Sequence, residues 1–558
     1  MTRRGSEPDA IRYMAWPADR RLPSPGGGGR RLLLAILIAA AVALVAGGAW
    51  LFANPSGPGP TAGATGSASP SAASSPTQGP TATPSPAAVQ VPLAVVSAFD
   101  AYKTIAVDRP ALAKRLAAGT LVLPCGAEAV IAAALETTLQ GAAPCVAADG
   151  ITAALDPGRG DLALLPPALV TPRVKVVPLE SADLFGQASA RAKPYPLTIL
   201  APAAWPAAWS AWDAADVRVV VTTGVTCPDR GVALQTILNK KGWDWLATAG
   251  TARITGTHVD HRFNPPAGYV TLNLVRTGNE GAVKELISGA DVAVSDFECA
   301  MTKNYKVHLS GTVFTIDPRV ARLMGDVGFD VATVAADHTT NAGLGAVGET
   351  VDFMKAAGVQ PTGAGRTLDE ALAPAIVEVN GLKFGFIGLD AIGGSRYATA
   401  TGSGVAHLTA ANVRTAVARA RAAGAQVVIA LVQWSSVEYQ ATFTSFQLST
   451  KKLLYANGID HIVGDDFHWA GALAIDLVGS TYRYTGSSQG NFWFDQNWSR
   501  QTEEAVITSL TFAGTRLVQV RLQSTVVVDN AQLNLTDPTT DGQFVLKQVL
   551  KGSTLPPR

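Results

Sequence analysis

Two aspartates and a histidine directly follow an apolar run in the stretch HIVGDDFHWAGA. They are Asp465, Asp466 and His468. Carboxylate oxygens and imidazole nitrogens bind divalent metals, so these residue types at this spacing could form part of a metal site. They could also form a polar turn at the end of a buried strand. The stretch alone leaves both interpretations open.

Several other apolar runs end in polar residues in the same way, and they predict the elements that position this chemistry. The predicted strands are VRVVVTTG, ADVAVSDFE, FDVATVAADH, LKFGFIGLD, AQVVIALVQW and IDHIVGDDFH. The predicted helices between them are GAVKELISG, PRVARLMGDVG, AVGETVDFMKAAG, AANVRTAVARARAAG and SFQLSTKKLLYANG. Apolar strands that alternate with amphipathic helices indicate a largely buried sheet, and chemistry in such sheets collects where the strands end.

The polar strand ends form a characteristic series when they are taken in order. They read GVTCPDR, SDFEC, AADHTTNAG, LVQWSSVEY and GDDFHWAG, followed by the tail SSQGNFWFDQ. Over about residues 217–535 this series resembles the poly-γ-glutamate capsule protein CapA family, a branch of the calcineurin-like metallophosphoesterase superfamily. The resemblance implies an α/β fold, in which two packed sheets are flanked by helices as in the calcineurin-like metallophosphoesterase sandwich.

The resemblance also implies a set of metal ligands. Family members carry Gly-Asp, Asn-Leu-Glu, Asn-Asn-His, His-Trp-Gly and Gly-His-His-Pro-His at these strand ends, which supply ligands for one or two metals. Val225 stands at the first acidic position here and cannot coordinate a metal. One metal position would be held by Glu298, Asp337, Gln433 and Asp466. This all-oxygen set suits Mg²⁺, Mn²⁺ or Ca²⁺. The other position keeps only Glu298 and His468, and we expect it to be empty.

Two alternatives to a metal site remain open. Because three imidazoles that bind metal in the family are replaced, the metal could be lost and the polar residues kept as hydrogen-bonded turns. A metal-free site with shared protons is the other alternative, since carboxylates gathered at one end of a sheet repel one another and have raised pKa values. A bound cation is the simplest relief of that repulsion.

The residues expected to act in catalysis are His338, His468 and Arg230. His338 would protonate or orient a leaving group, while the cation polarises an amide or phosphate oxygen and activates water. Such a site predicts a metal-dependent hydrolase or transferase that acts on an anionic envelope polymer. The alternative is a catalytically inactive binding or scaffold module of an export complex. His258 and His261 are interpreted as polar residues on a loop.

The first 90 residues predict a membrane anchor and a tether. Residues 32–53, LLLAILIAAAVALVAGGAWLFA, carry no charge and have roughly the 20 apolar residues that cross a bilayer as a helix. Arginines precede them, so residues 1–31 are expected to be a basic cytoplasmic tail, with everything after the helix outside the cell membrane. A cleaved signal peptide is the alternative. Residues 54–90, rich in Pro, Gly, Ser, Thr and Ala, predict a flexible linker.

Two folded parts are expected beyond the linker. Residues 91–215 predict a small α/β domain of unknown role, residues 216–535 the CapA-like domain, and residues 536–558 a C-terminal tail. The formal net charge of +1 and the lack of a basic aromatic stripe argue against a nucleic-acid partner. The expected partners are an anionic polymer, the membrane through the N-terminal helix, and membrane proteins of capsule synthesis.

Four cysteines would lie outside the membrane, where disulfides form. Cys125 and Cys145 are close in sequence and could staple a helical hairpin. Cys227 and Cys299 each follow a strand, and in the fold that the resemblance implies those strand ends lie side by side. A disulfide between them and two separate buried thiols both remain open.

Overall fold

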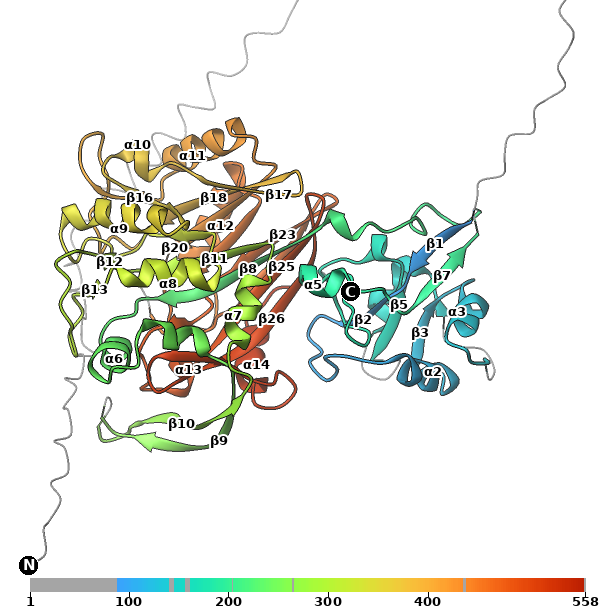
Figure 1. Ribbon diagram of the computed structural model, residues 1–558. Helices are drawn as coiled ribbons and strands as arrows, with labels where there is room; N and C mark the ends of the chain where they lie inside the picture. Colours follow the sequence, from blue (N-terminus) through green and yellow to red (C-terminus); the bar gives the residue numbers. More distant parts are fainter. Residues whose placement is uncertain are drawn as a thin grey trace, which may run out of the picture. The chain divides into compact units, whose positions relative to one another are not determined.

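The computed structural model describes residues 88–139, 145–155, 161–202, 204–262, 265–434 and 438–555. The predicted cytoplasmic tail, the predicted membrane anchor at 32–53 and nearly all of the predicted linker lie outside these ranges. Within them, no helix combines the length and the apolar character that crossing a membrane requires. Two large sheets and one small sheet make up most of the described fold (Figure 1).

The first large sheet has ten strands in the order β10-β9-β27-β26-β25-β8-β11-β14-β15, and β24 also pairs with β8. Their bounds are β8 Val217–Thr226, β9 Thr251–Asp260, β10 Tyr269–Gly278, β11 Val292–Phe297, β14 Val331–Thr333, β15 Gln360–Thr362, β24 Asn491–Trp493, β25 Glu504–Ala513, β26 Arg516–Val528 and β27 Gln532–Leu535. Strands β8, β11, β14 and β15 are parallel, so their carboxyl ends meet at one edge. His258 lies on β9, and its prediction as a loop residue is therefore wrong.

The second large sheet has six strands in the order β17-β18-β20-β21-β23-β22. Their bounds are β17 Ala375–Val379, β18 Leu382–Asp390, β20 Val427–Gln433, β21 His461–Asp465, β22 Leu473–Val478 and β23 Thr481–Gly486. The parallel register places Asp390 opposite Gln433 and Gln433 opposite Asp465. Three polar strand ends therefore lie side by side.

Apolar side chains from both large sheets form one buried cluster between them, which includes Val220, Val294, Phe384 and Leu431. Helices cover the outer faces: α7 Ala282–Ser288, α8 Arg319–Val327 and α9 Leu344–Ala356 on the first sheet, and α11 Ala410–Ala422 and α12 Ser445–Ala456 on the second. In α8 the apolar positions recur at helical spacing, and all of them are buried: Val320, Leu323, Met324 and Val327. The predicted two packed sheets with flanking helices are confirmed.

The described part of residues 91–215 contains helices and a small sheet, and we refer to it as the small α/β domain. Its sheet has the order β4-β3-β5-β2-β6. The bounds are β2 Ala94–Ala98, β3 Leu121–Pro124, β4 Cys145–Val146, β5 Leu162–Leu165 and β6 Val174–Val176, with helices α2 Arg109–Ala117 and α3 Glu128–Ala134 and a separate pair formed by β1 Val89–Pro92 and β7 Thr198–Ala201. A disulfide joins Cys125 to Cys145, so the predicted staple is present, although it links the region between β3 and α3 to β4.

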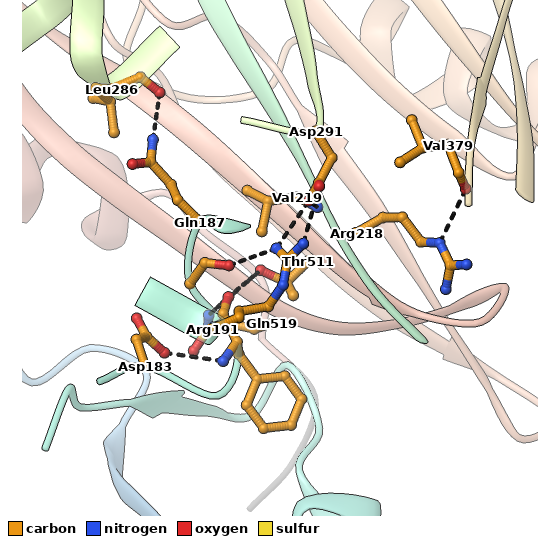
Figure 2. Close-up of polar contacts among 12 residues, drawn as sticks. Asp183, Gln187, Arg191, Arg218, Val219, Leu286, Asp291, Val379, Thr511 and Gln519 are labelled. Atoms are coloured by element: carbon orange, nitrogen blue, oxygen red, sulfur yellow. Dashed lines mark hydrogen bonds and ion pairs between the residues drawn. The ribbon is translucent and has the colours of Figure 1, made fainter. Parts of the chain in front are cut away.

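Buried polar contacts fasten this small domain to the first large sheet (Figure 2). Arg191 makes two hydrogen bonds of 2.9 Å to the two oxygens of Asp291, and the two side chains are only 6% and 8% exposed. Asp291 also accepts the Val219 N–H at 2.7 Å. From β26, Gln519 Oε1 accepts the Val176 N–H at 2.7 Å. By their contacts, the two predicted domains belong to one compact unit.

The predicted C-terminal tail contains a helix, α14 Gln543–Lys551. Its buried residues Val545, Leu546 and Val549 belong to the apolar cluster between the two large sheets. The folded part therefore continues beyond residue 535.

Candidate functional site

The predicted site residues meet where the strands of both large sheets end. Glu298 follows β11, Asp337 and His338 follow β14, Gln433 ends β20, and Asp466 and His468 follow β21. A disulfide between Cys227 and Cys299 ties the end of β8 to the end of β11, so the alternative of two separate thiols is wrong. A backbone bridge pairs Cys299 with His338 beside it. The second and third polar motifs are thus held together at one edge.

Gln433 links the two sheets through its side-chain amide. Its Nε2 donates to Glu298 Oε1 at 2.7 Å, and its Oε1 accepts the Asp337 N–H at 3.1 Å. Gln433 is 1% exposed, so these bonds form away from water. A carbonyl oxygen has two lone pairs, and the amide can hold this bond and still serve as a ligand. The residue that replaces a family histidine therefore braces the strand ends.

Burial and mutual repulsion dominate the electrostatics of the carboxylates. Burial raises the pKa of Glu298 well above its usual range, and the nearby charges of Asp296, Asp337 and Asp466 raise it further. Burial likewise raises the pKa of Asp466, with Asp337 the largest charge contribution. Asp466 Oδ2 is buried without a hydrogen-bond partner. These carboxylates thus favour protons or a cation over the free anions.

Asp296 is a site residue that the sequence reasoning missed. Burial raises the pKa of Asp296, and the charge of Asp465 raises it further. The nearby Gln433 amide lowers it, but the hydrogen bond from Gln433 Nε2 goes to Glu298. Neither carboxylate oxygen of Asp296 has a hydrogen-bond partner. The signal was present in SDFEC, because strand residues two apart point to the same side and Asp296 stands two before Glu298.

The two candidate histidines have different surroundings. His338 is a quarter exposed, with Nε2 3.4 Å from Asp337 Oδ2. Its Nδ1 lies 3.0 Å from Asn341 Oδ1, which also accepts a backbone N–H, so Nδ1 is the donor. His468 is buried, its Nδ1 lies 3.0 Å from Asn491 Oδ1, and burial lowers its pKa. Both rings therefore leave Nε2 for a ligand or a proton.

Arg230, predicted as a catalytic residue, is already engaged. Its guanidinium donates to Asp495, and Nη1 donates to the Gly311 carbonyl at 3.1 Å. The same group lies 4.8 Å from the ring centre of Phe314 and 5.0 Å from that of Phe494. A substrate would have to compete with these partners for the charge.

The comparisons with known proteins identify the central part of the chain. The family model described as "Bacterial capsule synthesis protein PGA_cap" matches residues 270–496. We call these matched residues the PGA_cap segment. A curated relative, "Capsule biosynthesis protein CapA" from Bacillus anthracis, is 24% identical over 292 residues, which cover 49% of this chain and 66% of the relative. The alignment therefore spans just under two thirds of the relative's length.

Two solved structures are similar to the chain at low identity. The 5'-nucleotidase precursor from Thermus thermophilus is 15% identical with a TM-score of 0.33, covering 60% of this chain and 58% of the other. The calcineurin-like phosphoesterase YfkN from Bacillus subtilis is 13% identical with a TM-score of 0.28, covering 59% and 98%.

The PGA_cap segment contains all the predicted metal ligands, and their donor chemistry fits a hard cation. Three of them are carboxylates, and Asp466 keeps a buried oxygen without a partner. Among the described residues, one group of three His, Cys, Asp or Glu side chains has its possible ligand atoms within 4.8 Å of one another. It consists of Cys125, Glu128 and Cys145, and its two cysteines form a disulfide. The strand-end carboxylates are gathered without that close spacing, so binding requires them to draw together.

Asp466 combines a buried carboxylate with an unusual backbone, a φ of 112° that glycine adopts readily. In cation-free protein at neutral pH, Asp466→Gly is expected to raise the free energy of unfolding by about 1–3 kcal/mol. The variant removes both the buried carboxylate and the backbone strain at this position. Asp466→Ala keeps the backbone conformation and removes only the carboxylate. Urea unfolding in EDTA should rank glycine above alanine by about 1 kcal/mol. Equal stability of the two variants would show that the backbone is unstrained.

Proposed function

We propose that this chain acts in the synthesis or processing of an anionic capsule polymer of the poly-γ-glutamate type. The PGA_cap match and the capsule biosynthesis relative support this role. We further propose that residues 32–53 anchor the chain in the cell membrane, with the folded part outside and near membrane proteins of capsule synthesis. The uncharged apolar run and the arginines before it support that placement.

The proposed activity is that of a single-cation hydrolase or transferase. The observation that carries it is the gathering of Glu298, Asp337 and Asp466 where the strands of both large sheets end. Burial raises the pKa of all three, and the charge of Asp337 adds to the rise at Glu298 and Asp466. Together with Gln433 they would hold Mg²⁺, Mn²⁺ or Ca²⁺, and the bound ion supplies a Lewis acid that activates water.

The chain's own residues would handle the proton. His338 is partly exposed and has Nε2 beside Asp337, so a proton held on Nε2 can pass to a leaving group at the mouth of the site. Asn341 fixes the ring by accepting from Nδ1. His468, buried and with a lowered pKa, is neutral at physiological pH and suits a ligand role better than proton donation.

A binding or scaffold module is the second candidate function. Two of the predicted site residues are already hydrogen-bonded within the protein, Gln433 to Glu298 and Arg230 to Asp495, and this favours the binding function. Val225 at the first acidic position also argues against a two-metal reaction. In this alternative the strand-end edge holds the polymer without turnover.

Turnover by the full-length protein distinguishes the two functions. Hydrolysis of γ-glutamyl and phosphoester substrates would be measured with added Mn²⁺ or Mg²⁺. We expect activity that falls by about 100-fold or more in Glu298→Gln and Asp337→Asn, because each loses a charge that the reaction needs. Asp326→Asn, an exposed acid on α8, is the matched control and should keep full activity. Polymer binding without turnover would establish the scaffold function.

A further inference from the structure

A loop that the proposed activity does not use borders the strand-end site. It joins β12 Ala300–Met301 to β13 Thr315–Ile316, and its residues 302–314 read TKNYKVHLSGTVF. We call these residues the rim loop. The loop begins shortly after Glu298 and ends at Phe314, whose ring centre lies 4.6 Å from that of His338. Both ends of the rim loop therefore lie at the strand-end site.

Two adjacent backbone N–H groups tie the end of the rim loop to buried side chains of this site. The Phe314 N–H donates at 2.9 Å to Asn341 Oδ1, the same atom that accepts from His338 Nδ1. The next N–H along the chain, that of Thr315, donates at 3.0 Å to Asp229 Oδ2. One short segment thus links the support of His338 to Asp229.

Asp229 orients a second imidazole, that of His308 in the rim loop. The Asp229 side chain is 0% exposed, and its Oδ2 lies 3.0 Å from His308 Nδ1. An ionised carboxylate only accepts hydrogen bonds, so Nδ1 is the donor and Nε2 is left for another group. The His308 side chain is 34% exposed, so a ligand can reach the ring.

The buried carboxylate gives His308 the chemistry of an anion-binding group. Burial raises the pKa of Asp229, while hydrogen bonds from the Thr315 N–H and the His308 ring lower it. Such a carboxylate is stabilised when its hydrogen-bonded partner is positive. A protonated His308 donates from Nδ1 to Asp229 and presents Nε2–H to a second anion. The positive ring would then lie between two negative groups.

Lysines extend the positive charge of the rim loop, which contains no Asp or Glu. Lys303 and Lys306 are both exposed. Glu349 on α9 accepts the Lys303 N–H at 3.0 Å and offsets part of the charge at that end of the loop. Lys306 stands two residues before His308, so it is the lysine that we expect to act with the ring.

We propose that the rim loop binds the free carboxylates of a γ-linked glutamate chain, with His308 Nε2 as a donor to one of them and Lys306 as a second positive group. Each unit of a γ-linked chain keeps its α-carboxylate, so the chain carries a regular row of anions. Hydrogen bonds between charged partners are stronger than those between neutral ones. The proposal rests on the proposed function, since it assigns residues that hold the same polymer, and it applies to the hydrolase and to the scaffold alike.

Binding of synthetic γ-linked chains to the full-length protein tests the rim loop. A short fluorescent glutamate chain is titrated in EDTA, which prevents cation-dependent turnover, and anisotropy is measured. We expect His308→Asn to weaken binding about 10-fold and Lys306→Gln about 3-fold. His308→Arg keeps a positive donor and should stay within about 3-fold of wild type. A chain with carboxamides in place of its carboxylates should bind wild type about 10-fold more weakly and be insensitive to these changes.

Lys452→Gln is the matched control for the loss of charge. Lys452 is an exposed lysine on α12, and its replacement should leave the affinity for the glutamate chain unchanged. Asparagine keeps an N–H donor for Asp229, so His308→Asn is expected to fold, and urea unfolding checks this. Lys306 is exposed, so Lys306→Gln provides a second test at a position that folding does not require.

The outcomes separate this proposal from the proposed function. Wild-type affinity in His308→Asn would overturn the rim-loop proposal, as would a loss in His308→Arg as large as in His308→Asn, or equal binding of the two chains. Turnover by wild type that is lost in Glu298→Gln would still support the hydrolase in each of these cases. Weakened binding in His308→Asn without turnover by wild type would support the rim loop together with the scaffold function. Wild type that neither binds nor turns over the chain would overturn both.

Discussion

Replacing Arg191 by leucine is expected to lower the free energy of unfolding by about 3–5 kcal/mol. The change leaves Asp291 buried without its counter-charge in the contact between the small α/β domain and the first large sheet (Figure 2). The Val219 N–H is then the remaining donor described for that carboxylate. Urea unfolding of the full-length protein, followed by circular dichroism, measures the loss.

A matched surface pair provides the control for this ion pair. Arg322 and Asp326 on α8 are 81% and 52% exposed, and Arg322→Leu should change stability by about 0.5 kcal/mol or less. The double variant Arg191→Leu with Asp291→Leu should recover much of the loss, since no unpaired charge remains. A loss in Arg191→Leu no larger than in Arg322→Leu would show that the two domains are not fastened by this contact.

Raising the pH from 5 to 8 without divalent cations is expected to destabilise the protein. Burial raises the pKa of Asp390 from 3.8 to about 6 and that of Glu503 from 4.5 to about 8. In the folded state both groups therefore hold protons that the unfolded chain has released. The stability that these two groups contribute is fully present below their pKa values in the unfolded chain. It is lost as the pH rises through their pKa values in the folded protein. The expected loss in the free energy of unfolding between pH 5 and 8 is a few kcal/mol, because a shift of one pKa unit in one group corresponds to about 1.4 kcal/mol.

Unfolding free energies measured in EDTA at pH 5, 6, 7 and 8 check this prediction. The pKa of Glu503 is 4.5 in the unfolded chain and about 8 in the folded protein, so Glu503→Gln should reduce the slope over the whole range from pH 5 to 8. The slope that remains from Asp390 should lie mainly below about pH 6. Glu285→Gln replaces a glutamate on α7 and should follow wild type. Stability that rises from pH 5 to 8 would mean that these carboxyl groups are not protonated in the folded state.

The strand and helix patterns predicted the fold well because burial imposes a regular period on each element. The apolar runs ending at Gln433 and Asp465 are strands, and the residues after them reach the edge that was expected. Three features depend on how distant elements meet and carry no local signal. They are the pair between Arg230 and Asp495, the bond from Arg191 to Asp291, and a small buried cavity that is lined by both Asp296 and Asp465.

The strand order sets the limits within which this chain can be shortened. Strand β8 opens the large domain, yet it pairs on one side with β25, so that Thr222 lies opposite Thr508. Residues 270–496, the PGA_cap segment, lack β8, β9, β25, β26 and β27, which form the centre of the ten-stranded sheet. If the chain were cut at those boundaries, β11 would lose its neighbour β8 and expose an unpaired strand edge, which promotes aggregation. Expression of the module therefore has to begin before residue 217 and continue through α14.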